Sequence, residues 1–230
     1  MPLENIESHS LLPDLLRPGG TVVDCGANLG TFSRVMVERF GVRVFAFEAS
    51  PAVFARIPGL PGLVARNIAV CGNDGVVQLA IDDDITRTAV AGEGRTGSGA
   101  ILEVEGRTLP RLLAEAGIAG DIEVLKLDIE GAELGVIDSM SDNLIRRIGQ
   151  ITIEFHDFLG YHSRDDVNAR VERIKALGFR ELWWSRTRNT ADVLLVNVQR
   201  LGVVRYMFEH NILRPARAVG RRVSRILNDA

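Results

Sequence analysis

The chain has 230 residues, 46% of them hydrophobic and 25% charged, with a formal net charge of −3, which is typical of a soluble protein with one α/β domain. No apolar run approaches the roughly 18 residues that span a bilayer, and the first residues lack the basic and apolar regions of a signal peptide. The two cysteines, Cys25 and Cys71, are too few for a disulfide framework or a metal cluster. We therefore expect a cytoplasmic, reduced setting.

Charge is unevenly distributed along the chain. Residues 200–230 contain seven arginines and two acidic residues, a net charge of +5, which leaves −8 for residues 1–199. We predict one domain at 1–199 and a basic amphipathic helical extension at 200–230. Such a tail suits an anionic membrane surface, a partner helix, or packing on its own domain or on a second copy. The acidity of the rest argues against nucleic acid as the main partner.

The first predicted elements alternate between strand and helix. An apolar strand at 22–24 leads into a glycine-rich turn and a helix that Gly41 ends. A second strand at 42–47 ends at Glu48, and Ser50 then caps a short helix. This alternation predicts βαβ units and a parallel sheet.

The later elements continue this pattern and then break it. Further strands are predicted at 63–70, 76–81, 101–104, 122–127 and 151–155, and further helices at 108–116, 132–140 and 163–177. The polar loop 82–99 is predicted to lack packed structure and to be either mobile or substrate-facing. Strands at 179–184 and 193–198 have no room for a crossover helix between them, so we expect them to be antiparallel.

The glycine-rich turn follows the pattern D-x-G-x-N-x-G, formed by Asp24, Gly26, Asn28 and Gly30. Open α/β sheets bind ligands at this edge; glycines let the backbone approach a ligand, and asparagine tolerates left-handed dihedrals. Glu48, at the end of the next strand, can accept two ribose hydroxyls. A dinucleotide would need G-x-G-x-x-G, whereas the charge of Asp24 suits an ammonium or sulfonium. The pattern therefore predicts a site for a cationic nucleoside such as S-adenosylmethionine.

Several segments together resemble one family. GGTVVDCGANLGTFS, VFAFEASP, NIAVCG, GRTLPRLLAEAGI, LKLDIEGAEL and ITIEFHDF have the order and spacing of FkbM-type methyltransferases over roughly residues 18–198. The resemblance implies a three-layer α/β sandwich of the Rossmann-like class I methyltransferase fold. Its seven-stranded, mostly parallel sheet would have the order 3-2-1-4-5-7-6, with strand 7 antiparallel. It also implies S-adenosylmethionine as the methyl donor, and hydroxyl oxygens of sugars or secondary metabolites as acceptors.

The resemblance also implies which residues hold the cofactor. The methionyl part would be surrounded by Asp24, Gly26, Asn28 and Gly30. Glu48 would bind the ribose, and the adenosine would be bordered by Ala49, Ser50, Asn67, Ile68 and Ala69. Asp128, at the end of the fourth strand, would contact the methionyl group or the acceptor.

Catalysis would need alignment of acceptor and methyl group, and a base for the proton that a hydroxyl loses. The predicted catalytic residues lie where the fourth and fifth strands end: Asp128, Glu130, Glu154 and His156. We predict His156 as the base because an imidazole titrates near neutral pH, although a structural role for it is the alternative. Asp128, Glu154 and His156 could chemically hold magnesium or manganese, but nothing in their spacing requires a metal and none is predicted.

We therefore predict an S-adenosylmethionine-dependent O-methyltransferase that acts on a small-molecule or glycan acceptor. Two alternatives stay open at this point: a nicotinamide-dependent oxidoreductase on a similar sheet, and a non-catalytic module that binds a membrane or partner through its tail. The sequence does not identify the acceptor, the oligomeric state or the role of the tail.

Overall fold

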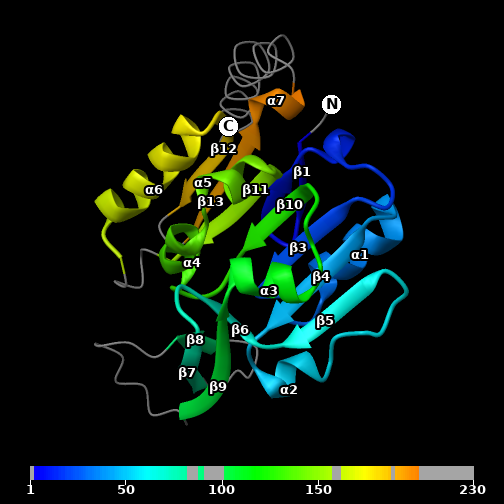
Figure 1. The fold of residues 1–230 in the computed structure, drawn as a ribbon, viewed down its shortest axis with the longest axis vertical. Coiled ribbons are helices and arrows are strands. Elements are labelled where there is room, and N and C mark those ends of the chain that lie inside the picture. Colours follow the sequence, from blue (N-terminus) through cyan, green and yellow to red (C-terminus); the bar gives the residue numbers. More distant parts are fainter. Residues whose placement is uncertain (1–2, 82–87, 91–100, 157–161, 188–189, 202–230) are drawn as a thin grey trace, which may run out of the picture.

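A computed structural model describes residues 3–81, 88–90, 101–156, 162–187 and 190–201. At its centre lies a seven-stranded sheet in the order β12-β13-β11-β10-β3-β4-β5 (Figure 1). The strands are β3 Thr21–Cys25, β4 Arg43–Glu48, β5 Leu63–Asn67, β10 Ile122–Leu127, β11 Ile148–Phe155, β12 Phe179–Thr187 and β13 Thr190–Asn197. Numbered within this sheet in chain order and read from β5, they give 3-2-1-4-5-7-6, which confirms the predicted topology.

Strand direction also follows the prediction. The strands from β5 through β4, β3 and β10 to β11 are paired in parallel, and β13 is antiparallel to both β11 and β12. Only residues 188 and 189 separate β12 from β13 in the chain, so a crossover helix cannot form and the chain must reverse. The carboxyl ends of β3, β4, β10 and β11 therefore meet at one edge of the sheet.

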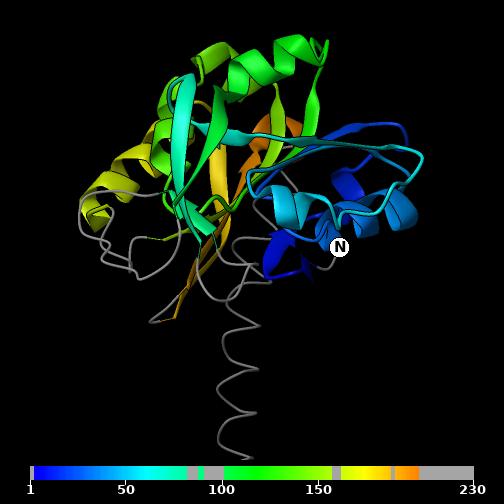
Figure 2. The same ribbon diagram turned by 90° about the horizontal axis from the view of Figure 1, so that it is seen from below.

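Helices cover both faces of this sheet (Figures 1 and 2). The helices are α1 Thr31–Phe40, α2 Pro51–Phe54, α3 Leu109–Glu115, α4 Glu133–Ser139, α5 Asp142–Arg146, α6 Arg164–Ala176 and α7 Val198–Leu201, with a 3₁₀ turn at Pro13–Leu15. On one face α3 to α6 pack against Val23 and Leu125, and on the other α1 packs against Val22 and Val124. Successive strand residues point to opposite faces, so these neighbours serve two cores.

Helix ends agree with the signals in the sequence. Ser50 caps α2 by accepting a hydrogen bond from the Val53 backbone N–H at 3.4 Å. Ser163 and Asp166 form the predicted capping box at the start of α6. Thr108 lies at the N-cap of α3 but makes no side-chain cap hydrogen bond. The five-residue helix α5 was not predicted.

A second sheet extends from the end of β5. It has the order β6-β9-β7-β8 and consists of β6 Ala69–Cys71, β7 Gly75–Ile81, β8 Thr88–Val90 and β9 Ile101–Thr108. The single strand predicted at 63–70 is therefore wrong, because the chain leaves the first sheet after Asn67 and pairs with β9 instead. The prediction of no packed structure at 82–99 is wrong at β8, which pairs with β7. The rest of that loop, and the extension from residue 202 onward, lie outside the described residues.

A hairpin at the N-terminus completes the fold. Its strands, β1 Glu4–Ile6 and β2 His9–Leu11, are antiparallel, and β2 contacts β11 and β13. The turn between them places Glu7 and Ser8 at φ angles of 48° and 68°, in the left-handed region. Sequence analysis did not predict this hairpin, because neither turn residue is a glycine or asparagine.

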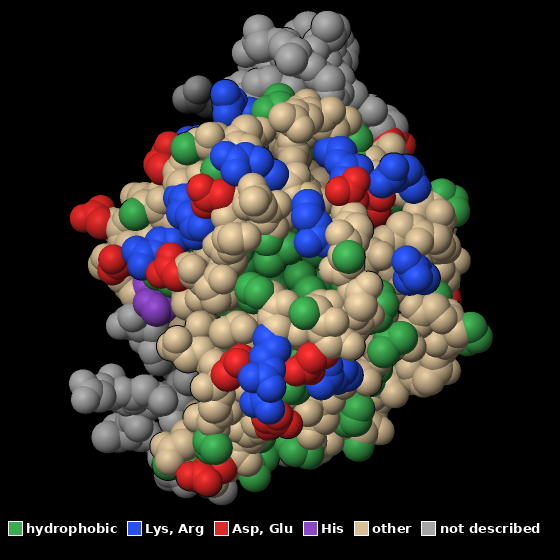
Figure 3. Space-filling model, in the orientation of Figure 1, with side chains coloured by type: hydrophobic (Ala, Val, Ile, Leu, Met, Phe, Trp, Pro, Cys, Tyr) green, Lys and Arg blue, Asp and Glu red, His purple; other side chains and the backbone are tan. Residues whose placement is uncertain are grey.

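Two hollows lie away from the carboxyl ends of the strands. One, of about 500 Å³, lies at the opposite edge of the sheet and is lined by residues that include Thr21, Arg43 and Glu123. The other, of about 380 Å³, lies between α3 and α5 and includes Leu113 and Leu144. The face in Figure 3 has hydrophobic side chains at the centre of a hollow and charged ones around it. Neither hollow contains any residue that the sequence identifies as a site candidate.

Among the described residues, no helix is both long enough and apolar enough to cross a membrane.

Candidate functional site

The glycine-rich turn connects β3 to α1 and has three residues in the left-handed region. The φ angles are 81° at Gly26, 50° at Asn28 and 74° at Gly30. The expectation that Asn28 adopts a glycine-like conformation is thus confirmed. Gly30 is the N-cap residue of α1, so the turn leads directly into the first helical residue, Thr31.

The chain itself explains why residue 26 is glycine. A β-carbon at Gly26 would lie 1.7 Å from the carbonyl oxygen of Asp128, and at Gly30 it would lie 3.0 Å from Ile57. The sequence suggested that the glycines let a ligand approach, but their first constraint is contact with the protein's own backbone and side chains. Gly26 nevertheless also borders the cleft described below.

Asp24 lies behind the turn and is 0% exposed. Its Oδ2 accepts a hydrogen bond from the Ser33 hydroxyl at 2.6 Å, and its Oδ1 is 3.1 Å from the Lys126 ammonium. Lys126 also donates to the Gly26 carbonyl oxygen at 2.7 Å. The carboxylate of Asp24 therefore fixes the turn from below and does not line the cleft, so it would act on a bound cofactor through its charge and through the turn.

Glu48 is held in place by the backbone. Its Oε2 accepts the N–H of Asn28 and its Oε1 the N–H of Ser50, both at 2.8 Å. Burial raises the pKa of Glu48, and the hydrogen bonds from Ser50 and Asn28 counteract only part of that rise. Each carboxylate oxygen can accept a second hydrogen bond, so this oriented group can still bind hydroxyls.

The remaining adenosine candidates divide into lining and supporting residues. Ala49, Ile68 and Ala69 line a hollow together with Glu48. The Asn67 side-chain amide instead donates to the backbone oxygens of Glu48 and Ala49, at 2.8 and 3.0 Å, and so fixes the corner at which the chain leaves the first sheet. Neither Asn67 nor Ser50 is among the residues that line the hollow.

Two narrow hollows meet at the turn and form one cleft. The first, of about 80 Å³, includes Glu48, Ile68 and Glu130, and the second, of about 160 Å³, includes Glu7 and Lys126. Both are lined by Gly26, Asn28 and Asp128. Each is smaller than the roughly 300 Å³ at which small-molecule pockets begin, so a nucleoside would require the rim to open.

Asp128 lines both hollows and lies beside His9, Lys126 and His156. Its Oδ2 lies 3.2 Å from the His9 Nε2 and 3.3 Å from the Lys126 ammonium. Burial on its own would raise the pKa of Asp128, but Lys126 and the two histidines, His9 and His156, outweigh it and hold the pKa below its usual range. Asp128 is therefore a carboxylate at neutral pH, and its side chain is 27% exposed.

His156 lies at the carboxyl end of β11 and is surrounded by carboxylates. Its Nδ1 donates to Glu133 Oε1 at 2.8 Å, and its Nε2 is 3.5 Å from Glu130 and 3.9 Å from Asp128. Burial would lower the pKa of His156, but Glu133, Glu130 and Asp128 raise it to about 9. The expectation that His156 titrates near neutral pH is therefore wrong, and His156 is an imidazolium at pH 7.

The motif DIEGAE forms the turn after β10, and the structure shows what its acidic residues do there. Glu133 is 0% exposed and accepts hydrogen bonds from the Gly131 N–H, at 3.1 and 3.2 Å, as well as from His156. This turn holds Glu130 at a φ of 51°, a strained conformation for a residue with a side chain. Burial is the main cause of a raised pKa at Glu130, which lines the cleft beside Asp128.

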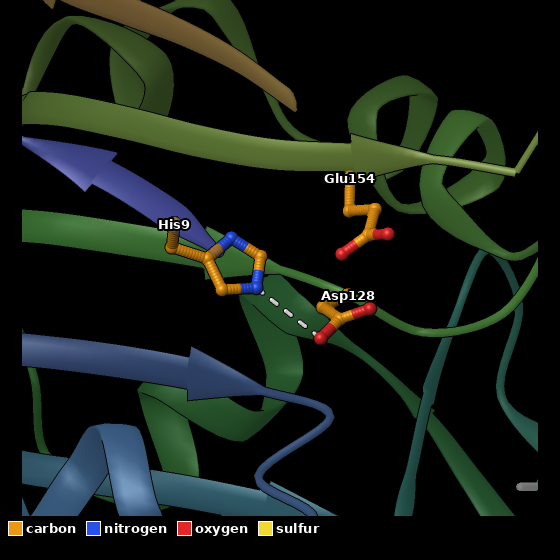
Figure 4. A group of neighbouring side chains, drawn as sticks. All are labelled: His9, Asp128 and Glu154. Carbon is orange, nitrogen blue, oxygen red and sulfur yellow. Dashed lines mark hydrogen bonds and ion pairs between the residues drawn. The ribbon is translucent and has the colours of Figure 1, made fainter. Parts of the chain in front are cut away.

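Glu154 and Asp128 face a residue that sequence analysis missed. His9, Asp128 and Glu154 place one potential metal ligand each within 4.8 Å of one another (Figure 4). The sequence made Asp128, Glu154 and His156 a chemically possible set of metal ligands. In the structure His9 takes the place of His156 in this set. No signal in the sequence pointed to His9, because it reaches the site from a hairpin that was not predicted.

Comparisons with known proteins identify the family of this chain. Residues 24–181 match the model of the methyltransferase FkbM domain. The 31-O-demethyl-FK506 methyltransferase FkbM of Streptomyces tacrolimicus is 32% identical over 179 residues, which cover 63% of this chain and 68% of that protein.

Two further matches are more distant. AMB antimetabolite synthetase AmbE of Pseudomonas aeruginosa is 24% identical over 206 residues, 72% of this chain, which spans only 10% of that much longer protein. A solved structure of Aeropyrum pernix fibrillarin with natively bound S-adenosyl-L-methionine is 11% identical, covers 80% of this chain and 69% of that one, and has a TM-score of 0.47.

The family match covers the glycine-rich turn, the Glu48 corner, the DIEGAE turn and His156, all of which border or support one cleft at the carboxyl edge of the sheet. The chain therefore belongs to the FkbM methyltransferase family and is an S-adenosylmethionine-dependent methyltransferase with a Rossmann-like class I fold.

Proposed function

We propose that the chain methylates a hydroxyl oxygen of a sugar or secondary metabolite. The observation that carries this proposal is the convergence of Glu48 and Asp128, from two different strands, on one cleft beside the glycine-rich turn. When bound, S-adenosylmethionine supplies an electrophilic methyl group on a sulfonium cation. The residues of this chain must then bind the nucleoside, orient the acceptor and take up a proton.

The first hollow has the chemistry that a nucleoside needs. Glu48 presents oriented carboxylate oxygens for ribose hydroxyls, and apolar side chains such as Ile68 and Leu79 offer contact for a base. Three acidic residues, Glu48, Asp128 and Glu130, line this hollow, and no described lysine or arginine does, which favours a cation near the turn. On this basis we propose that the following residues bind the cofactor or support its site: Asp24, Gly26, Asn28, Gly30, Glu48, Ala49, Ser50, Asn67, Ile68, Ala69 and Asp128.

The charges of His156 and Glu130 change which residue we propose as the base. His156 is protonated at neutral pH, so it suits a hydrogen-bond donor that orients Glu130 or the acceptor. Glu130 lines the cleft, has a raised pKa and is only half-buried, so it is the better proton acceptor. We propose that Glu130 would receive the proton that the hydroxyl loses as its oxygen bonds to the methyl carbon, while the bond from that carbon to the donor's sulfur breaks and leaves a neutral thioether. Asp128, Glu154 and His156 would position the acceptor.

A relative supports oxygen as the methylated atom. The name of the Streptomyces protein, 31-O-demethyl-FK506 methyltransferase, describes methyl transfer to an oxygen of a natural product. The carboxylates at this edge are also suited to accepting hydrogen bonds from several hydroxyls of an acceptor.

A methyl-donor assay with labelled S-adenosylmethionine over a panel of hydroxylated natural products and glycans tests the proposal. The label should appear as an O-methyl group, identified by NMR of the product. Glu130→Gln should lower turnover about 100-fold while affinity for the demethylated cofactor stays near that of the wild type. Transfer to nitrogen or carbon, or full turnover by Glu130→Gln, would contradict the proposed reaction or the proposed base.

A further inference from the structure

His9 is a buried residue in direct contact with the candidate site, although it lies outside the matched family domain at residues 24–181. It is 1% exposed, and its Nε2 lies 3.2 Å from Asp128 Oδ2. Its Nδ1 lies 3.4 Å from the Thr152 hydroxyl, and its ring meets that of Phe32 edge-on, with centroids 5.9 Å apart. One side chain from β2 thus contacts β11, α1 and the residue that follows β10.

The hairpin that carries His9 is firmly attached to the sheet. Leu12 directly follows β2. Its backbone N–H donates to Gln150 Oε1 at 2.7 Å, and Gln150 Nε2 donates back to the Leu12 carbonyl at 3.1 Å. Leu11 is 0% exposed in the core beneath α1. At the other end, Glu7 borders the second hollow from a left-handed conformation that its surroundings must maintain.

The hydrogen-bond inventory fixes the role of the ring. A carboxylate can only accept, so His9 Nε2–H donates to Asp128, and Nδ1 lies within hydrogen-bond distance of the Thr152 hydroxyl. Both ring nitrogens are therefore engaged within the protein, and the buried ring cannot reach a ligand. Together with Lys126, His9 anchors Asp128 Oδ2, which leaves Oδ1 as the oxygen nearer to His156.

We propose that His9 is a positioning residue that fixes the orientation of Asp128, and that the N-terminal hairpin is therefore a working part of the cofactor cleft. This inference rests on the proposed role of Asp128 as a cofactor ligand. It implies that a chain without this hairpin would retain the matched domain but bind the cofactor weakly. The hydrogen bond acts on a charged group that lines both hollows, so its loss should be visible in affinity.

A divalent cation held by His9, Asp128 and Glu154 is the competing explanation for the same cluster. The Lys126 ammonium, 3.3 Å from Asp128 Oδ2, already supplies positive charge to that oxygen, and the His9 nitrogen is already directed at it. The geometry therefore favours positioning, and the experiment separates the two.

The test uses the full chain and calorimetric binding of S-adenosylhomocysteine, the demethylated cofactor. His9→Leu removes the donor and should weaken binding about tenfold. His9→Gln can place an amide N–H near the position of Nε2 and should restore binding to within about threefold. Leu63→Ala on β5 is the control, because it removes packing from the core cluster that contains Leu11 without touching the hairpin or Asp128. It should lower thermal stability but leave affinity near that of the wild type.

A double-mutant cycle with Asp128→Asn measures the coupling between His9 and Asp128 in cofactor affinity. A purely structural role of His9 would produce no such coupling. If His9 acts through Asp128, His9→Leu should weaken binding little further in the Asp128→Asn background. Additive losses, unchanged affinity in His9→Leu, or a His9→Gln variant as weak as His9→Leu would overturn the proposal. Loss of activity on chelation that Mg²⁺ or Mn²⁺ restores in the wild type, but no longer in His9→Gln, would make His9 a metal ligand instead. Absence of any binding by the wild type would overturn the assignment of the cleft itself.

Discussion

At the scale of single residues, charge pairing determines what the site can do. His156 is protonated because three carboxylates surround it, and the proton acceptor must therefore be sought elsewhere. Glu133 is the partner closest to the ring and also closes the turn that carries Glu130. One buried carboxylate thus positions both the imidazolium and the proposed base.

The raised pKa of His156 predicts a pH dependence of stability. The folded-state pKa of about 9 lies above the ordinary value of 6.5, so folding favours the protonated ring. The stabilisation is fully present below about pH 6.5 and is lost as pH rises through about 9; it amounts to about 3 kcal/mol in the free energy of unfolding. Urea unfolding at pH 6.5 and 9.5 should show this loss in the wild type and a much smaller one in Glu133→Gln. Equal slopes in both proteins would contradict the pairing.

A pair of glycine substitutions isolates the contact beneath the turn. Gly26 and Gly19 have similar φ angles, 81° and 75°, but a β-carbon at Gly19 would meet nothing within 4 Å. Gly19→Ala should therefore cost only about 1–2 kcal/mol, the strain of a left-handed residue. Gly26→Ala must also displace the Asp128 backbone, so thermal unfolding should show a larger loss and calorimetry a weakened cofactor affinity. Equal losses in the two variants would refute the steric argument.

At the scale of elements, the N-terminal hairpin and the corner after β5 carry most of what the sequence did not reveal. The central strands were predictable because apolar runs end at polar residues such as Asp24, Glu48 and Asp128. The corner at Asn67 was not, since its turn comes from a side chain that caps backbone oxygens of a neighbouring strand. The contacts of His9 depend on packing across 119 residues of sequence, which no local pattern encodes.

The attachment of the hairpin predicts a selective opening. Gln150→Leu leaves the buried N–H and C=O of Leu12 without their partners, at about 1–3 kcal/mol for each group. Hydrogen exchange measured by mass spectrometry should accelerate in residues 4–12, and cofactor affinity should fall because His9 is displaced. Gln78→Leu is the control, because the Gln78 side chain on β7 is exposed; this change should alter stability by less than about 0.5 kcal/mol. Unchanged exchange at 4–12 in Gln150→Leu would show that the hairpin is held by other contacts.

At the scale of the whole molecule, the fold separates a catalytic edge from the remaining surface. The family resemblance and the terminal antiparallel strands predicted the order of the sheet, and the structure confirms both. The cofactor residues stay predictions, although their placement around one cleft supports them. The acceptor could not be predicted, because its contacts come from loops whose residues carry no distinct chemical pattern.

The basic extension is expected to act independently of the cleft. A chain ending at Leu201 should keep the thermal stability and cofactor affinity of the full chain, because the core and cleft residues among those that the structure describes all precede that point. We propose that the six arginines after Leu201 bind an anionic membrane surface. Sedimentation with phosphatidylserine vesicles should retain the full chain and lose the shortened one, whereas neutral vesicles should retain neither. Equal retention of both chains would exclude the extension as the membrane contact.

The central claim is that Glu48 and Asp128 hold the nucleoside of S-adenosylmethionine at the carboxyl edge of the sheet. Isothermal titration calorimetry of S-adenosylhomocysteine with the wild type and Glu48→Gln tests it most directly. We expect saturable one-to-one binding by the wild type and an affinity at least about tenfold lower for Glu48→Gln, because an amide cannot accept all the hydrogen bonds of the carboxylate. No binding by the wild type, or equal affinity in the folded Glu48→Gln variant, would contradict it.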